Sequence, residues 1–433
     1  MKLTYAVLHH ASSNAALVVG FLLLYSVLVV YVRSTCWRDP TSRFFQAQRA
    51  HAPSYSTERI QEARRYADSM AKGARVEAKN ATTRSPELCI GIPSVQRDGI
   101  SYLKATLGSL QHGLSDEERD RLRFVVLLAH TNQTQHTDHG EPWLVKMADS
   151  LPSYHDSAER LALAMRMEDN RSHAVKSKFD YSILMEECAK LAAPYMLLVE
   201  DDVVFLDGWR HRTVKAVGTA MMKSWEAAQS DFLYLRLFYY EALLGWNIES
   251  WPKYAAWSAA FAASILSLLN LAKRYMAPAR RFITRPVFIL SLGLFTPLIL
   301  LLFFAAGANC LFPQPSGVQL MPANACCGQG LVFPLSTVVG ELLPLFRDNR
   351  WSESPTDSFI EDYADATGRL RWALTPVVMQ HVGSKSTYEV DKSRYGNMTP
   401  SDIWNFAFER NDARRLAEEH AQAVAELRDL ETS

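Results

Sequence analysis

The chain has 433 residues, 48% of them hydrophobic, and its 46 basic and 46 acidic side chains give a formal net charge of zero. This length allows one large or two medium-sized domains. The balanced charge and the lack of a nucleic-acid-binding motif indicate that nucleic acid is not a partner. The apolar residues gather in a few segments, which points to a membrane protein.

Three apolar segments are candidate membrane spans. Residues 15–32 are just long enough to cross a bilayer as a helix. A cleaved signal peptide is the alternative, but Tyr31-Val32-Arg33 is not a small-residue cleavage site, so we expect an uncleaved signal anchor. Residues 254–272 are a weaker candidate for a membrane span, and the alternative is that they form a buried helix of a soluble domain. Residues 286–306 are strongly apolar despite Pro297, which a membrane helix tolerates.

The charges between the second and third spans predict the topology. This loop contains no acidic residue and five basic ones: Lys273, Arg274, Arg280, Arg281 and Arg285. The positive-inside rule therefore places it in the cytoplasm. Residues 1–14 then form a cytoplasmic tail, and 254–306 form a membrane hairpin. The segments 33–253 and 307–433 lie together on the luminal side.

Glycosylation sequons and cysteines agree with a luminal location. All four sequons fall in the expected luminal parts: Asn80, Asn132, Asn170 and Asn397. A lumen permits disulfides, and Cys310 with Cys326 or Cys327 is the nearest plausible pair. Spacing does not fix the connectivity, and buried thiols are the alternative for the last two.

Residues 33–86 are polar, with helical spacing between 57 and 78. We expect a luminal stem here, with a helix packed on the luminal domain as the alternative. From residue 87 the pattern changes. A buried strand at 88–93, a helix at 102–110 and a second strand at 124–129 open a βαβ unit. The sequence thus predicts an α/β fold with a mostly parallel sheet.

Three acidic residues end the strand of the stretch Met196–Trp209, which reads MLLVEDDVVFLDGW. Carboxylates at a strand end can hold a divalent cation, and nucleotides also bind at such strand ends. An acidic turn between two strands is the alternative. We expect Asp202 to bind a metal, and Glu200 and Asp201 to orient a nucleotide sugar. A cation would neutralise the diphosphate leaving group.

After the third span, residues 377–380 form a short strand that ends at His381. Mixed carboxylate and imidazole sites suit Mn²⁺, although a single histidine can equally be structural.

A helix that starts near Ser354 carries three candidates for the general base, Asp357, Glu361 and Asp362. The first two share a helix face and the third points away. Asp357 could instead complete a capping box with Ser354, so spacing leaves the choice open.

Four motifs in the same order resemble the GT-A glycosyltransferases related to N-acetylglucosaminyltransferase IV. They are Ile90–Arg97, Asp180-Tyr181, Leu198–Val203 and Gln380-His381-Val382-Gly383. A membrane hairpin inside the catalytic domain is not expected of those enzymes. It is typical of the related transferases that add a GalNAc branch to the GPI glycan, and this chain resembles that family more.

The resemblance implies a GT-A luminal domain, in parts 87–253 and 307–433, that moves GalNAc from UDP-GalNAc to the first mannose of the GPI glycan in the Golgi, with inversion. It implies Mn²⁺ as cofactor, bound by Asp202 and His381. The implied nucleotide-sugar-binding residues are Pro93, Ser94, Arg97, Asp180, Glu200 and Asp201. Glu361 departs from the aspartate expected there, so the base remains open.

Two alternative functions explain less of the sequence. One is an N-glycan GlcNAc transferase, which would not explain the membrane hairpin. The other is a non-enzymatic membrane sorting factor on a degenerate transferase fold, which would not explain the intact acidic triplet.

Overall fold

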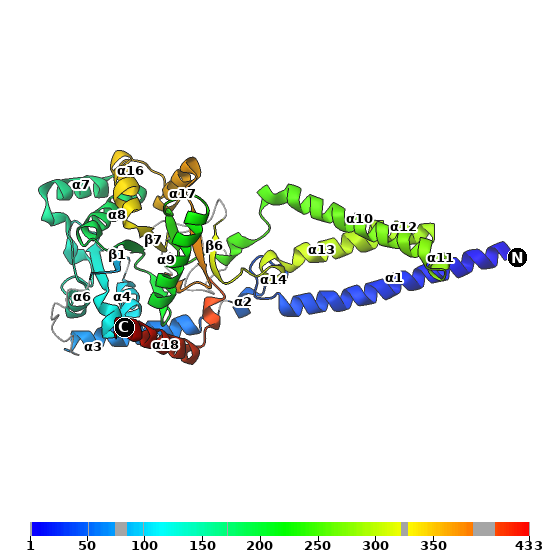
Figure 1. Cartoon of the computed structure of the whole chain (residues 1–433), viewed down its shortest axis with the longest axis horizontal. Helices are drawn as coiled ribbons and strands as arrows, with labels where there is room; N and C mark the ends of the chain where they lie inside the picture. The colour runs from blue at the N-terminus through cyan, green and yellow to red at the C-terminus, as the bar shows by residue number, and fades with distance from the viewer. Residues whose placement is uncertain are drawn as a thin grey trace. The chain divides into compact units, whose positions relative to one another are not determined.

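The computed structural model describes residues 2–50, 52–73, 85–97, 99–170, 172–321, 328–383 and 403–432 (Figure 1). The chain divides into two compact units. The first, called the helical unit, contains Met1–Ala50 and Glu241–Gln314. The second, called the α/β unit, contains His51–Tyr240 and Pro315–Ser433.

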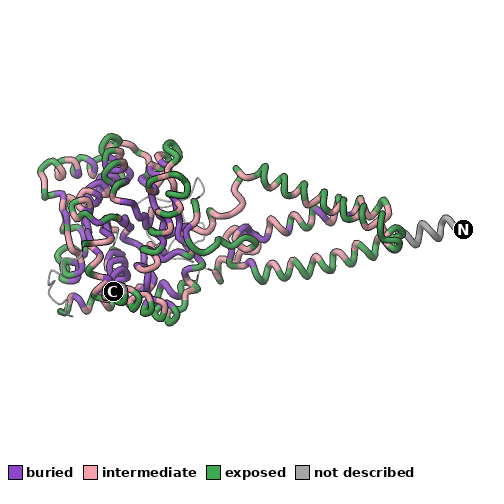
Figure 2. Tube along the Cα trace, in the orientation of Figure 1, coloured by how far each residue is buried: buried purple, intermediate pink, exposed green. Residues whose placement is uncertain are grey.

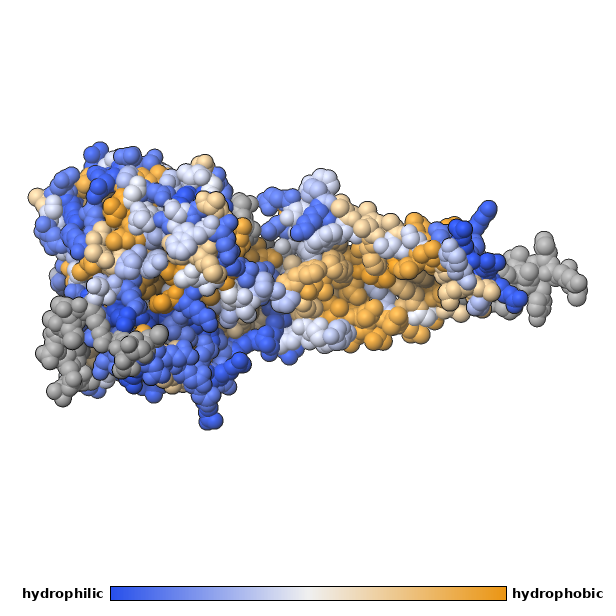
Figure 3. Space-filling model, viewed as in Figure 1, coloured by the Kyte–Doolittle hydropathy of each residue, from blue (hydrophilic) through white to orange (hydrophobic). Residues whose placement is uncertain are grey.

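The helical unit is built from long apolar helices. Within the described residues, three helices are long and apolar enough to cross a membrane, at Asn14–Thr35, Glu241–Tyr275 and Arg285–Ala306. The helices of the unit are α1 (Lys2–Thr35), α2 (Ala47–Ala50), α10 (Trp251–Tyr275), α11 (Ala279–Phe282), α12 (Arg285–Leu290), α13 (Thr296–Ala306) and α14 (Ala308–Leu311). Figure 3 shows a mostly hydrophobic surface along them and hydrophilic residues near α11.

Two details of these helices answer points that the sequence left open. No residue of α10 is buried, which argues against a soluble core helix at 254–272 (Figure 2). Pro297 follows a π-helical turn at Ser291–Phe295. A π-helical turn accommodates a proline, which has no N–H to donate, without ending the helix. α12 and α13 therefore continue as one apolar span.

The expected pairing of Cys310 is wrong. Cys310 forms a disulfide with Cys36, which follows α1. The segment after α1 packs against the end of α13, with the Ser42 hydroxyl donating to the Ala305 carbonyl at 3.1 Å, and this contact brings the two cysteines together. Cys326 and Cys327 lie outside the described residues.

Within the described residues, a seven-stranded sheet forms the centre of the α/β unit, in the order β2-β1-β3-β7-β5-β8-β6. Its strands are β1 (Leu88–Ser94), β2 (Leu122–Leu128), β3 (Tyr195–Val199), β5 (Tyr234–Arg236), β6 (Gly317–Leu320), β7 (Gly330–Pro334) and β8 (Arg371–Thr375). β1 is parallel to β2 and β3, and β5 is parallel to β8. β7 and β6 run antiparallel to their neighbours, so the predicted mostly parallel sheet is confirmed.

Helices cover the sheet and bury its apolar side chains. The first half of this unit contains α3 (Tyr55–Ala71), α4 (Leu103–Gln111), α5 (Asp116–Asp120), α6 (Pro142–Met147), α7 (Ala158–Asp169), α8 (His173–Lys190) and α9 (Trp209–Glu226). After the helical unit follow α15 (Leu335–Thr337), α16 (Leu343–Asp348), α17 (Thr356–Thr367) and α18 (Ala413–Thr432). The core joins Ile183 and Leu184 of α8 to Met196 and Leu198 of β3. A second disulfide, Cys89–Cys188, links β1 to α8.

Several predicted elements have different ends in the structure. β1 continues through Pro93 to Ser94. Its pairing with β3 ends at Gly91, before the proline whose missing N–H would weaken a central strand. The sequence also predicts a helix at 178–193, but α8 begins earlier, at His173, because the Ser172 hydroxyl caps it by accepting from the Val175 amide at 3.4 Å.

Part of the expected stem is a packed helix. α3 lies against α4 so closely that a Cβ added at Gly108 would collide with the backbone of Ala63. The buried Arg59 guanidinium donates to the carbonyls of Ser109 at 3.2 Å and Phe205 at 3.0 Å. Residues 55–71 therefore belong to the α/β unit, as in the alternative considered for this segment.

Two of the predicted sequons can be placed. Asn132 and Asn170 are exposed, as glycosylation requires. Asn80 and Asn397 lie outside the described residues.

Candidate functional site

The acidic triplet forms the turn between β3 and the short strand β4 (Val203–Phe205). Glu200 continues the β3–β7 pairing by donating its amide to the Gln329 carbonyl at 3.0 Å. The buried Thr106 hydroxyl of α4 donates to the Asp201 carbonyl at 2.6 Å and accepts from the Val203 amide at 3.2 Å. The triplet is thus both an acidic turn and the predicted strand-end cluster, held in place on two sides.

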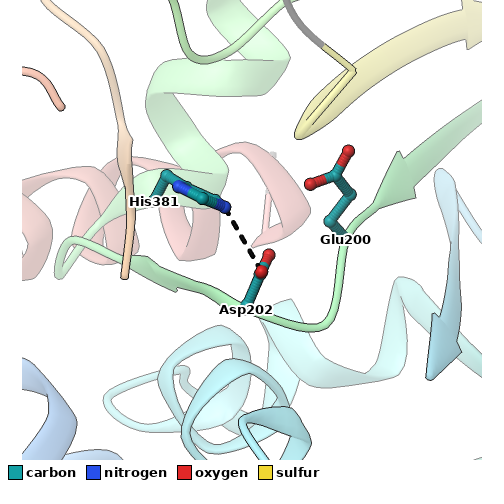
Figure 4. A group of neighbouring side chains, drawn as sticks. All are labelled: Glu200, Asp202 and His381. Carbon is teal, nitrogen blue, oxygen red and sulfur yellow. Dashed lines mark ion pairs between the residues drawn. The ribbon is translucent and has the colours of Figure 1, made fainter. Parts of the chain in front are cut away.

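A second small sheet brings His381 to the triplet. β4 pairs antiparallel with β9 (Met379–His381), and Val203 lies opposite His381. Figure 4 shows Glu200, Asp202 and His381 pointing toward one another. One possible ligand atom from each lies within 4.8 Å of the others, and His381 Nε2 is 3.3 Å from Asp202 Oδ2.

The chemistry of this group fits a divalent cation. The Oδ1 atom of Asp202 is buried and has no hydrogen-bond partner within the described residues. Desolvation, and after it the negative charge of Asp202, raises the pKa of Glu200 to about 8, because two neighbouring carboxylates repel each other. A cation would supply the missing partner and relieve the repulsion. Gly383 provides the space that the Asp202 carboxylate occupies, since a Cβ at position 383 would collide with that carboxylate.

Asp201 holds the loop that follows β1. Its Oδ2 atom accepts from the Ser94 hydroxyl at 2.6 Å and the Val95 amide at 3.3 Å. Its Oδ1 atom accepts from Arg97 at 2.8 Å, and the same guanidinium reaches Asp202 Oδ2 at 3.2 Å. The structure thus brings Ser94 and Arg97 to the triplet, while Pro93 lies in the strand just before them.

His136 belongs to this network, and sequence reasoning missed it. His136 Nε2 lies 2.9 Å from the Ser94 hydroxyl, and its Nδ1 accepts from the Asp138 amide at 3.2 Å. Because Ser94 donates to Asp201, the pattern assigns the proton to Nε2 of a neutral ring. Burial, with Arg97 nearby, lowers the pKa of His136 to about 4, in agreement. The surrounding sequence is irregular and carries no signal for this role.

Asp180 is buried in α8 and accepts from the Tyr154 hydroxyl and from Lys176 at 3.4 Å. Burial raises its pKa. None of its hydrogen bonds within the described residues reaches the triplet.

The three base candidates on α17 have different surroundings. Asp357 lies near Glu200: a Cβ added at Gly328 would lie 3.7 Å from Asp357 Cβ and 3.6 Å from Glu200 Oε1. The capping box with Ser354 does not form, since Pro355 caps the helix. Asp362 is exposed.

Glu361 is engaged by basic and hydroxyl partners. Its Oε1 accepts from Arg236 at 2.6 Å and from the Tyr234 hydroxyl, and its Oε2 accepts from Arg371 at 2.7 Å. Both oxygens are therefore occupied within the protein.

The sequence model of one family, described as GPI-N-acetylgalactosamine transferase PGAP4, matches residues 88–380, which is more than half of the chain. The match begins at β1, includes the acidic triplet and Asp357, and ends one residue before His381. A comparison with curated proteins found no match.

Proposed function

Because this chain belongs to the GPI-N-acetylgalactosamine transferase family, it is a glycosyltransferase, and we propose that it moves GalNAc from UDP-GalNAc to the first mannose of the GPI glycan with inversion. The observation that carries this proposal is the convergence of Glu200, Asp202 and His381 at the end of β3. In open α/β sheets this edge is where nucleotides bind. The arrangement supports a GT-A fold.

The cofactor in this proposal is Mn²⁺. Asp202 and His381 would hold the ion, with Glu200 as the third neighbouring group. Carboxylate and imidazole ligands suit this metal, and the partnerless Oδ1 of Asp202 supports a cation there. When bound, the ion would neutralise the negative charge of the diphosphate.

Residues of the loop after β1 would bind the donor. The guanidinium of Arg97 would lie next to the diphosphate of the donor. In the structure it pairs with the carboxylates of Asp201 and Asp202. Ser94 and His136 would position Asp201, which would hold the nucleotide sugar together with Glu200. Asp180 and Pro93 would act indirectly, by holding α8 and β1 in position.

Asp357 is our choice of general base. It shares the space around Gly328 with Glu200, so it lies beside the proposed donor site. Glu361 has both oxygens occupied and Asp362 is exposed, so neither is placed to accept the proton of a sugar hydroxyl. Inversion needs one base and no covalent intermediate, which matches a single carboxylate.

The proposed location is the Golgi membrane, with the α/β unit in the lumen. The two disulfides among the described residues are typical of an oxidising compartment. The basic loop after α10 supports a cytoplasmic turn of the hairpin, and hence a cytoplasmic N-terminus. A GPI acceptor is anchored by its own lipid, so a membrane-bound enzyme meets it at a raised effective concentration.

The test is UDP release by the detergent-solubilised full-length chain with Mn²⁺, comparing UDP-GalNAc with UDP-GlcNAc. Release from UDP-GalNAc that increases on adding a GPI glycan would support the proposal. Preference for UDP-GlcNAc would indicate an N-glycan-type donor, and no release from either donor would contradict an enzymatic function.

A further inference from the structure

The segment that follows α1 concentrates positive charge. Residues 33–50 contain four arginines and a single acidic residue. The arginines are all exposed: Arg33, Arg38, Arg43 and Arg49. Two of their guanidinium groups lie over one indole ring. The Cζ atoms of Arg38 and Arg49 are 4.5 and 4.1 Å from the ring centroid of Trp37.

The single acid, Asp39, does not neutralise these arginines. Its Oδ1 accepts from the Thr41 amide at 2.8 Å and the Thr41 hydroxyl at 2.7 Å, and its Oδ2 accepts from the Cys310 amide at 2.7 Å. Within the described residues none of the four arginines forms an ion pair; Arg49 donates only to Gln46 at 3.2 Å. Two like charges held over one ring repel each other, and a bound anion would offset that repulsion.

The segment is fixed where two candidate spans end. The Cys36–Cys310 disulfide ties it to α14. The Arg43 amide donates to Ala305 of α13 at 2.9 Å, and the Gln46 amide donates to Trp37 at 2.9 Å. These contacts hold the arginines on a loop next to the ends of α1 and α13, where a bilayer surface would lie.

The charge has the wrong sign for a luminal flank of a membrane span. Basic residues are enriched on the cytoplasmic side, where the leaflet is also anionic. A luminal group of four arginines therefore calls for an anionic ligand other than bulk lipid. Arginine binds phosphate through two parallel hydrogen bonds.

We propose that Arg38 and Arg49, stacked on Trp37, bind the phosphate of the inositol phosphate in the GPI acceptor. This inference rests on the proposed function, which supplies an acceptor whose phosphate lies at the membrane surface. Arg33 and Arg43 add positive charge around the pair. The loop is a phosphate-binding site for the acceptor, separate from the donor site in the α/β unit.

The test uses the full-length protein in nanodiscs of neutral phosphatidylcholine and two soluble acceptors. A GPI glycan released by a phosphatidylinositol-specific phospholipase C keeps the inositol phosphate. The same glycan released by a phospholipase D lacks it. We expect the KM of the wild type to be about tenfold lower for the phosphate-bearing glycan, as for a charge-assisted hydrogen bond.

The double variant R38Q/R49Q should raise this KM to that of the phosphate-free glycan and leave UDP-GalNAc hydrolysis without acceptor unchanged. R38K/R49K keeps the charge but not the bidentate geometry, and should fall between the two. The matched control is Arg64→Gln, an exposed arginine of α3, which should change neither KM.

Equal KM values for the two glycans in the wild type would overturn the inference while leaving the proposed function standing. So would a double variant that raises both KM values alike. If the double variant lowers binding to phosphatidylinositol vesicles but changes neither KM, the arginines bind bulk lipid and the inference is wrong. No GalNAc transfer to either glycan would contradict the proposed function itself.

Discussion

His381 Nε2 lies 3.3 Å from Asp202 Oδ2, although the apolar helices α10, α12 and α13 separate the two residues in sequence. The cause is the β4–β9 pairing, which sets His381 opposite Val203, the residue after Asp202. The site is therefore assembled from the parts of the chain before and after those helices.

Asp202→Asn should abolish most of the activity without unfolding the protein. The change removes a proposed metal ligand, and we expect UDP release to fall about 100-fold or more, the usual loss when a group that stabilises developing charge is removed. The change would also remove the ion pairs of Asp202 with Arg97 and His381, but it would relieve the repulsion of Glu200, so we expect only a small change in the unfolding temperature. Asp169→Asn, an exposed aspartate of α7, is the matched control. Wild-type activity of the Asp202 variant would refute the metal assignment.

Gly383→Ala should weaken metal binding without removing a ligand. The added Cβ would displace the Asp202 carboxylate. We expect the Mn²⁺ concentration for half-maximal UDP release to rise about 10- to 100-fold, as when a group that orients a metal ligand is changed. Gly340→Ala is the control, because nothing lies within 4 Å of its added Cβ. An unchanged Mn²⁺ dependence would show that Asp202 does not bind the ion.

Asp357→Asn and Glu361→Ala should fail in different ways. Loss of a general base costs about 100- to 10,000-fold, so Asp357→Asn should lose transfer to the acceptor yet keep its unfolding temperature. Glu361→Ala removes the ion pair that the buried Arg236 makes with Glu361, so unfolding should become easier by about 3 kcal/mol. Transfer rates and chemical denaturation distinguish the two. A stable, inactive Glu361→Ala with an active Asp357→Asn would reverse the assignment.

His420 should make the stability of the α/β unit depend on pH. It lies buried on α18, with Nδ1 2.7 Å from Asp207 and Nε2 2.9 Å from Glu118 of α5. Burial alone would lower the pKa of His420, but the hydrogen bonds to Asp207 and Glu118 outweigh this and raise it from 6.5 to about 9. The folded protein therefore binds this proton more tightly than the unfolded chain does.

The resulting stabilisation, about 3 kcal/mol, is fully present below pH 6.5 and is lost as the pH rises through about 9. Thermal unfolding of the wild type and of His420→Gln across this range measures it, with exposed His139→Gln as the control. We expect the unfolding temperature of the wild type to fall over this range and that of His420→Gln to change much less. Parallel curves for the two proteins would contradict the prediction.

The sequence predicts the parts of this site that depend on local pattern. Strand and helix periodicity places the acidic triplet after β3 and His381 at the end of β9, where the structure has them. The mostly parallel sheet follows from the alternation of strands and helices.

Contacts between distant segments could not be predicted in this way. The Cys36–Cys310 disulfide depends on how the end of α1 meets α14, whereas spacing favours a nearer pair. Arg236 and Arg371 form ion pairs with Glu361 from two neighbouring strands, and no spacing in the sequence predicts these pairs. His136 reaches Ser94 from an irregular segment without periodicity.

The most direct test of the central claim is the mass of the GPI glycan made by cells that lack a GPI GalNAc transferase and express this chain. We predict that the wild type adds one N-acetylhexosamine, identified as GalNAc on the first mannose, and that Asp202→Asn, expressed at the same level, adds none. A glycan unchanged by the wild type, or extended equally by Asp202→Asn, would contradict the account.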